Sequence, residues 1–412
     1  MSTFKPFKAV RPKPELAEKI SSLPYDVMNR AEAKKMAESN PYSFLHITRS
    51  EIDLDESVDA YDESVYLKAN DNLNRFVSDG IMVQDNTPRY YIYRQIMQGR
   101  AQTGIVGCAS VDEYLNDAIK KHELTREEKE IDRIKNFDYC SAHTEPVFLT
   151  YKKSDSINKA VASWIENNSP LYEFQSEDGI SHILWAITDD QINKSIENEF
   201  SKLESLYIAD GHHRSASSVK VGLKRRENSE SFTGNEEFNY FMTVAFPDDD
   251  LFIMDYNRVV KDLNGLTEAE FLEKLREKFI VSVSDKSYKP AEKHTFGMYL
   301  NNRWYKLTAK QGAFDPESII DSLDVSILQN NVLSPLLGIE NPKKDKRIDF
   351  IGGIRGLSEL ERRCAADMAV AFSMFPVMIG DLFRIADAGM IMPPKSTWFE
   401  PKLRSGLFVH RF

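Results

Sequence analysis

Hydrophobic residues recur along the chain in patterns that predict both helices and strands. Over residues 58–79 an apolar residue returns every three or four positions, which is typical of one face of a helix. Shorter apolar runs bounded by turn residues predict strands. On these criteria we expect helices at residues 31–39, 58–79, 111–134, 189–203, 215–224, 321–333 and 378–388. We expect strands at residues 90–93, 104–108, 145–151, 183–187, 206–209, 240–246, 251–254, 347–351 and 368–375, and a hairpin at 298–305.

This mixture of helices and strands predicts an α/β or α+β protein with mixed sheets rather than a doubly wound fold. The chain has 412 residues, and at roughly 150 residues per domain this length suggests two or three domains. We divide it into an N-terminal region over residues 1–140, a central region over 141–310 and a C-terminal region over 311–412. The sequence contains no internal repeat.

Composition and charge exclude several classes of protein. Hydrophobic residues make up 42% and charged residues 28%, which is ordinary for a globular protein and argues against a disordered or fibrous chain. The net charge is −11, so the chain as a whole repels nucleic acid. The cysteines, Cys108, Cys140 and Cys364, have no zinc-ligand spacing, which favours a reducing compartment. Since no signal peptide or membrane-spanning run is visible, we expect a cytoplasmic protein without a membrane partner.

The most distinctive motif is Asp210-Gly211-His212-His213-Arg214, which follows a predicted strand and precedes a predicted helix. Such a turn exposes main-chain N–H groups, which suit an anion, and an arginine can fork onto a phosphate or carboxylate. Asp210 can hold a cation or accept a proton from a hydroxyl group. The alternative is a helix-capping aspartate followed by surface histidines.

A second motif lies in the predicted helix 111–134, where His122, Arg126, Lys129 and Arg133 are spaced three or four residues apart. On a helix this spacing forms one face, and a row of cations there could bind a polyphosphate. The alternative is a solvated helix with salt bridges to its interleaved glutamates.

A third motif near the C-terminus places Lys395, Ser396 and Thr397 after two prolines. One positive charge and two hydroxyl groups can bind a phosphate, although no glycine-rich segment precedes them as in a Walker A loop. The alternative is a C-terminal strap with a structural role only. A fourth group, residues 24–27 with residues 40–46, indicates no chemistry by itself.

Together these motifs resemble one family, the domain of unknown function 1015 proteins. The resemblance extends over residues 5–410 and rests on residues 23–27, 40–43, 121–126, 132–133, 145–147, 209–214, 336–339, 386–389 and 392–397. It implies a ParB/sulfiredoxin-like core with additional α+β elements. It also implies similarity to the free L-serine kinases of that superfamily, which carry the same Asp-Gly-His-His-Arg string at their nucleotide phosphate site.

The resemblance implies roles for the motif residues. Asp210, His212 and His213 would be catalytic. The ligands of phosphate or substrate would be Arg214, His122, Arg126, Lys129, Arg133, Lys395, Ser396 and Thr397. The free serine kinases use an upstream glutamate as general base, and here Glu51, Glu123 and Glu145 are open.

We therefore expect a phosphotransferase that acts on a small hydroxyl compound, foremost free L-serine. The donor would be ATP, ADP or pyrophosphate, with Mg²⁺ at Asp210. Two other classes stay open: a phosphoesterase with Mn²⁺ or Zn²⁺ bound by Asp210, His212 and His213, and a non-catalytic nucleotide-binding regulator. Specific nucleic-acid binding is not expected, because the chain is acidic and has no helix-turn-helix pattern. A homo-oligomer stays open.

Overall fold

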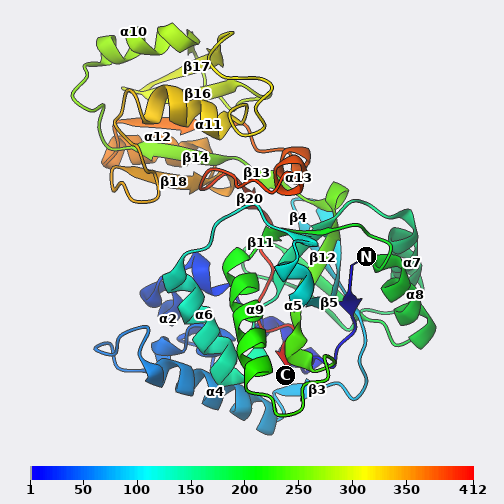
Figure 1. Cartoon of the computed structure of the whole chain (residues 1–412). Coiled ribbons are helices and arrows are strands. Elements are labelled where there is room, and N and C mark those ends of the chain that lie inside the picture. Colours follow the sequence, from blue (N-terminus) through cyan, green and yellow to red (C-terminus); the bar gives the residue numbers. More distant parts are fainter. Residues whose placement is uncertain (1) are drawn as a thin grey trace. The chain divides into compact units, whose positions relative to one another are not determined.

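The computed structural model describes residues 2–412, which form two compact units (Figure 1). The first unit runs to Leu251 and also contains Pro401–Phe412, and the second unit is Phe252–Glu400. These boundaries differ from the three expected regions. The reason is that strands on both sides of residue 310 pair in one sheet, while the C-terminal segment returns to the first unit.

The first unit is built on a nine-stranded mixed sheet. Its strands and those of its small two-stranded pairs are β1 (Phe4–Lys5), β2 (Val10–Pro12), β3 (Met82–Gln84), β4 (Tyr91–Met97), β5 (Arg100–Ser110), β6 (Ile119–Lys120), β7 (Ala142–His143), β8 (Val147–Tyr151), β9 (Tyr172–Gln175), β10 (Ser181–Ala186), β11 (Leu206–Asp210), β12 (Tyr240–Pro247) and β21 (His410–Arg411). The strand order is β6-β11-β8-β12-β5-β4-β10-β9, with β1 paired to β5. Two neighbouring pairs, β6–β11 and β8–β12, are parallel, and the other pairs are antiparallel.

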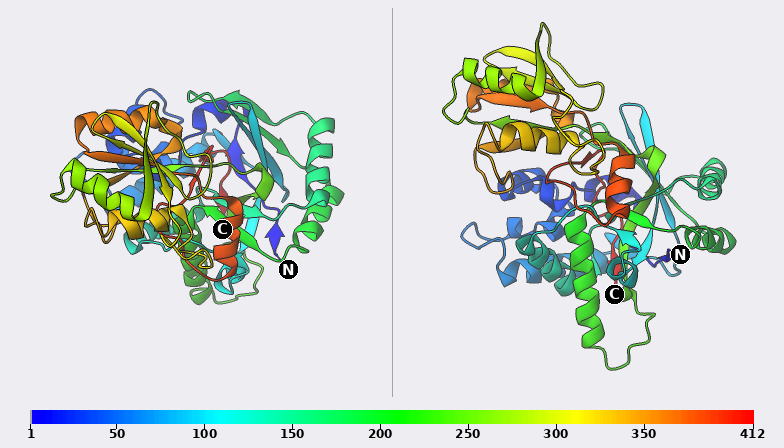
Figure 2. Two further views of the ribbon diagram at one scale, coloured as in Figure 1. Left: turned by 90° about the horizontal axis from the view of Figure 1, so that it is seen from above. Right: turned by 45° about the horizontal axis from the view of Figure 1, so that its top comes forward.

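Helices cover both faces of this sheet. The helices of this unit are α1 (Ala17–Ile20), α2 (Arg30–Ala37), α3 (Leu45–Thr48), α4 (Glu63–Ser78), α5 (Val111–Leu115), α6 (Glu127–Cys140), α7 (Asp155–Asn167), α8 (Asp190–Phe200) and α9 (His212–Glu227), with 3₁₀ turns that include η2 (Tyr25–Val27) and η3 (Ser50–Asp53). Helices α7 and α8 lie on one face, and α6 and α9 pack together on the other (Figures 1 and 2). Ile157 of α7 and Phe200 of α8 pack in one core with Leu149 and Ile208 of the sheet.

The second unit contains a six-stranded antiparallel sheet in the order β15-β17-β16-β19-β14-β18. The strands of this sheet are β14 (Tyr256–Val260), β15 (Phe279–Ser284), β16 (Thr295–Leu300), β17 (Arg303–Ala309), β18 (Ile348–Gly352) and β19 (Val370–Ser373). Two further strands, β13 (Ile253–Met254) and β20 (Trp398–Phe399), pair separately. The helices of this unit are α10 (Glu268–Lys278), α11 (Asp324–Leu328), α12 (Leu357–Ala366) and α13 (Ile379–Asp387), and a π-helical turn, Gln329–Leu333, follows α11.

The expected mixed α/β class is confirmed, as are most of the expected elements. The predicted hairpin is β16–β17, which turns at Asn301 and Asn302 with φ of +48° and +57°. All three cysteines are free thiols. None of the helices within residues 2–412 is long and apolar enough to cross a membrane.

The prediction of one helix over residues 111–134 is wrong. The chain forms the short helix α5, turns at Asp117 with φ of +59°, and then adds β6 to the edge of the sheet. Ile119 is fully buried in this position beside Leu206. Burial of Ile119 and pairing with β11 therefore override the local helical pattern, and the second helix, α6, starts only at Glu127.

Candidate functional site

A tight turn joins β11 to α9 and brings the Asp-Gly-His-His-Arg side chains together. Gly211 lies between them with φ of +92°, in the left-handed region that favours glycine. A Cβ atom at this position would lie 2.9 Å from Nε of Arg214. Glycine thus lets α9 begin directly after Asp210, with the Arg214 side chain folded back over the turn. The expected strand–turn–helix connection is confirmed.

The carboxylate of Asp210 lies beside two cations. Its Oδ2 atom is 3.5 Å from Nη2 of Arg214 and 3.4 Å from Nζ of Lys402. Burial acts to raise the pKa of Asp210, but the positive charges of Lys402 and Arg214, together with the hydrogen bond from Lys402, bring it well below its usual range. The lowered pKa means that the carboxylate of Asp210 is ionised. Because 33% of its side chain is exposed, a ligand can reach it.

Arg214 is buried and acts within the protein. Its Nη1 atom donates to the main-chain carbonyl of Pro146, while Nη2 faces Asp210. Burial acts to lower its pKa, but the carboxylates of Asp210, Asp26 and Glu145 raise it, so the guanidinium stays charged. Arg214 therefore orients Asp210 and contributes positive charge to the turn.

The two histidines of the turn accept hydrogen bonds from the loop before α6. Nε2 of His212 accepts from the N–H of His122 at 3.4 Å, and Nε2 of His213 accepts from the N–H of Arg126 at 2.9 Å. An accepting Nε2 assigns the ring proton to Nδ1. Burial, aided by nearby positive groups, lowers the pKa of both histidines, so both are neutral at pH 7. They tie the loop to α9, and each keeps an N–H donor at Nδ1.

The four cations expected on one helical face do not share a helix, so that prediction is wrong. His122 lies in the loop before α6, where it is buried with its ring centroid 4.4 Å from that of His212. Arg126 is the exposed N-cap residue of α6, and only Lys129 and Arg133 belong to the helix. The physical reason is the formation of β6, which ends the helical path before His122.

Arg133 is held in a buried network of acids. Its Nη1 is 3.1 Å from Oε2 of Glu145, its Nη2 is 2.9 Å from Oδ2 of Asp132, and its guanidinium lies 3.8 Å from the ring centroid of Tyr25. The other oxygen of Glu145 accepts hydrogen bonds from the N–H of Tyr25 and the hydroxyl of Ser405. The network links α6, η2 and the C-terminal segment, and the charge of Arg133 is balanced within the protein.

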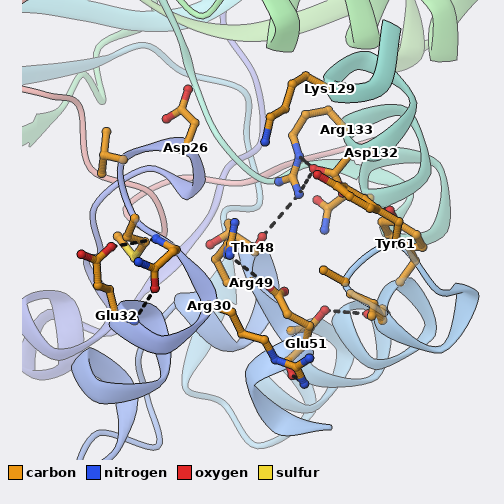
Figure 3. Close-up of a pocket in the computed structure, with 18 residues that line it drawn as sticks. Asp26, Arg30, Glu32, Thr48, Arg49, Glu51, Tyr61, Lys129, Asp132 and Arg133 are labelled. Atoms are coloured by element: carbon orange, nitrogen blue, oxygen red, sulfur yellow. Dashed lines mark hydrogen bonds and ion pairs between the residues drawn. The ribbon is translucent and has the colours of Figure 1, made fainter. Parts of the chain in front are cut away.

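A pocket of about 500 Å³ opens beside α6 in the first unit (Figure 3). This volume is typical of a small-molecule site. Figure 3 shows Lys129 extending from α6 and Asp26 projecting from the segment across from it. Within residues 2–412 neither side chain is recorded in a hydrogen bond or ion pair, so both charges are available to a ligand. The remaining polar lining consists of Asn29, Arg30, Glu32, Thr48, Arg49, Ser50, Glu51, Tyr61, Tyr66, Asp132, Arg133 and Asn136.

Asp26 links this pocket to the turn at Asp210, because its charge acts to raise the pKa of both His213 and Arg214. Sequence reasoning overlooked Asp26 and Lys402 as site residues. The signal for Asp26 was the Pro-Tyr-Asp-Val string of residues 24–27. The signal for Lys402 was its place just after the Lys395 motif.

The three glutamates left open as general bases lie in different surroundings. Glu145 is fully buried, with both carboxylate oxygens engaged in the Arg133 network. Glu51 lines the pocket and pairs with Arg49 at 2.8 Å. Glu123 is half-exposed, with Oε2 at 3.9 Å from Nδ1 of His212.

Lys395, Ser396 and Thr397 belong to the second unit. The main-chain carbonyl of Lys395 accepts from Nη2 of Arg258 at 3.0 Å. The hydroxyl of Ser396 donates to the carbonyl of Pro393 at 2.6 Å, which stiffens the loop. In the part of the chain that the structure describes, no three or more His, Cys, Asp or Glu side chains are grouped as a metal site.

The burial of His122 predicts a pH-dependent stability. Burial lowers the pKa of His122 to about 4, although the charge of Asp210 acts to raise it. A histidine in the unfolded chain has a pKa of about 6.5. Between these values the unfolded chain binds more protons, so the free energy of unfolding falls as the pH drops, by up to about 1.4 kcal/mol per pH unit from this group. Urea denaturation at pH 7 and at pH 5 measures this slope.

The His122→Phe variant isolates this contribution, because other buried histidines such as His143 and His182 titrate in both proteins. We expect a shallower pH slope in the variant. Equal slopes would show that His122 is not held neutral by burial.

The fold is thus a mixed α/β architecture with a charged turn and an adjacent pocket in its first unit. A family model described as "Protein of unknown function (DUF1015)" matches residues 4–326. The chain belongs to this DUF1015 family, and the resemblance seen in the sequence is confirmed.

Solved structures with a similar chain path include a free serine kinase variant in complex with AMP, with 12% identity and a TM-score of 0.36 over 76% of this chain and 95% of that chain. A C-terminally truncated SbnI from Staphylococcus aureus has 10% identity and a TM-score of 0.40, covering 74% of this chain and 87% of that chain. A conserved hypothetical protein from Pyrococcus furiosus has 12% identity and a TM-score of 0.35, covering 76% and 97%. No curated protein matches the chain.

Proposed function

We propose that this protein is a small-molecule kinase that phosphorylates free L-serine with ATP, ADP or pyrophosphate as the donor. The observation that carries the proposal is the ionised carboxylate of Asp210 beside Lys402 and Arg214, at the start of a helix without a side-chain cap. Phosphoryl transfer depends mainly on charge neutralisation and positioning, and this turn supplies both. The choice of serine rests on the Asp-Gly-His-His-Arg string shared with the free serine kinases.

The donor phosphates would bind at the turn. Lys402, Arg126 and the first N–H groups of α9 would neutralise their charge, and Nδ1–H of His213 would donate a hydrogen bond. Mg²⁺ is commonly held by one or two carboxylates together with substrate phosphates and water, and the single carboxylate of Asp210 fits that donor set. When bound, the ion would neutralise charge on the phosphates.

The acceptor would bind in the adjacent pocket, where Asp26 is the carboxylate available to take the hydroxyl proton. A bond forms between the serine hydroxyl oxygen and the transferred phosphorus, and the bond from that phosphorus to the leaving oxygen of the donor breaks. The serine hydroxyl proton passes to Asp26, and the leaving phosphate or nucleotide keeps the bonding electron pair. Lys129, on the other side of the pocket, would bind an anionic group of donor or acceptor.

The phosphoesterase alternative needs free lone pairs on His212 and His213 for a metal ion. Both Nε2 lone pairs accept main-chain N–H groups, and both Nδ1 atoms then carry protons. The geometry therefore favours the kinase.

The direct test incubates the purified protein with serine, Mg²⁺ and each of the three donors, and detects phosphoserine by mass spectrometry. Reactions without serine report donor hydrolysis. Phosphoserine formation with at least one donor is the expected result. Hydrolysis of a generic phosphate ester with manganese, without phosphoserine from any donor, would replace the kinase with the phosphoesterase. Nucleotide binding without turnover would replace it with the regulator.

We expect Asp26→Asn to lower kcat by about 100-fold or more, because general-base catalysis contributes about 10²- to 10⁴-fold. Glu32→Gln is a matched control: Glu32 lines the same pocket, but its carboxylate accepts from the N–H of Asn29 in a capping box. If both variants keep more than a third of the wild-type kcat, Asp26 is not the base.

We expect Arg126→Ala to lower kcat/KM for the donor by about 10- to 100-fold, the equivalent of one charge-assisted hydrogen bond. The KM for serine at saturating donor should stay within about twofold. Lys135→Ala removes a positive charge from the same helix, where Lys135 lies over the ring of Tyr66, and serves as the control. A donor-side loss below about threefold would exclude Arg126 as a phosphate ligand.

A further inference from the structure

Arg258 of β14 is a buried cation without an acidic partner. The residue is only 3% exposed, and its Nη1 and Nη2 atoms donate to the main-chain carbonyls of Tyr256 and Lys395. Among residues 2–412 no carboxylate is recorded in an ion pair with it, whereas the buried Arg133 and Arg214 each face one or more carboxylates. Burial lowers the pKa of Arg258 to about 10, so it remains charged at neutral pH. A buried charge without a partner is costly unless a ligand neutralises it.

Arg258 lines a pocket of about 280 Å³ that lies wholly in the second unit. A guanidinium has five N–H donors, and two of them serve the main-chain carbonyls, so three remain for a tetrahedral oxyanion. Lys343 adds an exposed positive charge to the lining, and its side chain has no recorded ion pair within the described part of the chain. Glu340 also lines the pocket, and its carboxylate accepts a hydrogen bond from the hydroxyl of Ser334 at 2.9 Å.

Two unusual backbone segments border the same pocket. Pro393 and Pro394 line it and lead into Lys395, which has φ of +59° and whose carbonyl is held by Arg258. The π-helical turn Gln329–Leu333 contributes both of its end residues to the lining. Single π-helical turns occur frequently at functional sites. The two prolines that precede the Lys395 motif and the π-helical turn thus meet at the pocket that contains Arg258.

We propose that this pocket binds the phosphate group of a small molecule, with Arg258 as the central ligand and Lys343 as a second cation. The site is carried by residues of the second unit alone. It does not depend on the kinase activity proposed for the first unit.

The test measures hydrogen–deuterium exchange of the full-length protein with and without pyrophosphate, at ionic strength matched with potassium chloride. We expect slower exchange in peptides that cover residues 340–347 and 393–397, with a saturable dependence on pyrophosphate. The Asp210→Asn variant should keep this protection. Absence of protection in the wild type would overturn the inference and leave the kinase proposal intact, whereas protection without phosphoserine formation would overturn only the kinase proposal.

Two substitutions and one matched control locate the ligand. Arg258→Lys keeps the charge but loses the fork, and should raise the pyrophosphate concentration for half-maximal protection by about tenfold or more. Lys343→Ala should raise it by about three- to fivefold. Lys344→Ala removes the same charge from an exposed residue outside the lining and should leave it unchanged.

Far-UV circular dichroism checks the fold of Arg258→Lys, and the Lys343 and Lys344 pair tests the proposal even if that variant is unstable. If Lys343→Ala and Lys344→Ala change the pyrophosphate concentration for half-maximal protection equally, the lysines attract pyrophosphate only at long range. That result would overturn the proposed binding site.

Discussion

The Asp210→Asn variant is expected to lose about 100-fold or more in kcat for phosphoserine formation, with the KM for serine changed by less than about threefold. An amide has nearly the shape of the carboxylate but no charge, so it cannot balance Lys402 and Arg214 or hold a cation beside the donor phosphates. An interaction that acts in the transition state affects kcat rather than substrate affinity. Steady-state kinetics with phosphoserine detected by mass spectrometry measures both constants.

The control for Asp210 is Asp189→Asn, at the N-cap of α8 in the same unit. Asp189 accepts hydrogen bonds from the N–H groups of Gln191 and Ile192 and is a genuine helix cap. Its substitution should lower the free energy of unfolding by at most about 1 kcal/mol and leave kcat unchanged. If Asp210→Asn behaves in the same way, Asp210 is a structural residue of the turn and the kinase mechanism loses its central carboxylate.

The Arg133→Met variant is expected to lose about 3–5 kcal/mol of the free energy of unfolding, because it leaves the carboxylates of Glu145 and Asp132 in the protein interior without their partner. Urea denaturation measures this loss. Lys34→Met is the matched control, since it breaks the exposed ion pair with Glu56 and should cost less than about 1 kcal/mol.

The double variant Arg133→Met/Glu145→Gln should regain part of the stability, since it removes the buried negative charge along with its partner. One result for the single variant Arg133→Met would restore the earlier interpretation of Arg133 as a phosphate ligand. That outcome is an Arg133→Met protein with nearly wild-type stability but a raised KM for the phosphate donor.

The turn at Asp210 could be predicted because its signals are local. An apolar run, one glycine and a change of periodicity lie within a few residues of one another, and the left-handed conformation of Gly211 follows from the sharp change of direction. The hairpin at Asn301 and Asn302 was predictable for the same reason.

The prediction of a row of cations failed, because regular spacing shows only which side chains would share a face if the segment were helical. The pairing of β6 with β11 depends on contacts between residues about 90 positions apart in the chain, as does the hydrogen bond from His122 to His212. Such contacts ended the helix and buried His122, while Arg126 stayed exposed and Lys129 half-buried.

The sequence by itself determined the mixed α/β class, most of the helices and strands, and the motif at residues 210–214, because each of these depends on periodicity or turn chemistry within a short window. Only the tertiary structure decided which charges are available and which are used internally. Arg133 is neutralised by Glu145, Lys402 reaches Asp210 from the far end of the chain, and Arg258 is buried without an acid. The physical reason is that the state of a charge depends on burial and on partners, and the partners here are brought together by the fold rather than by neighbouring positions in the sequence.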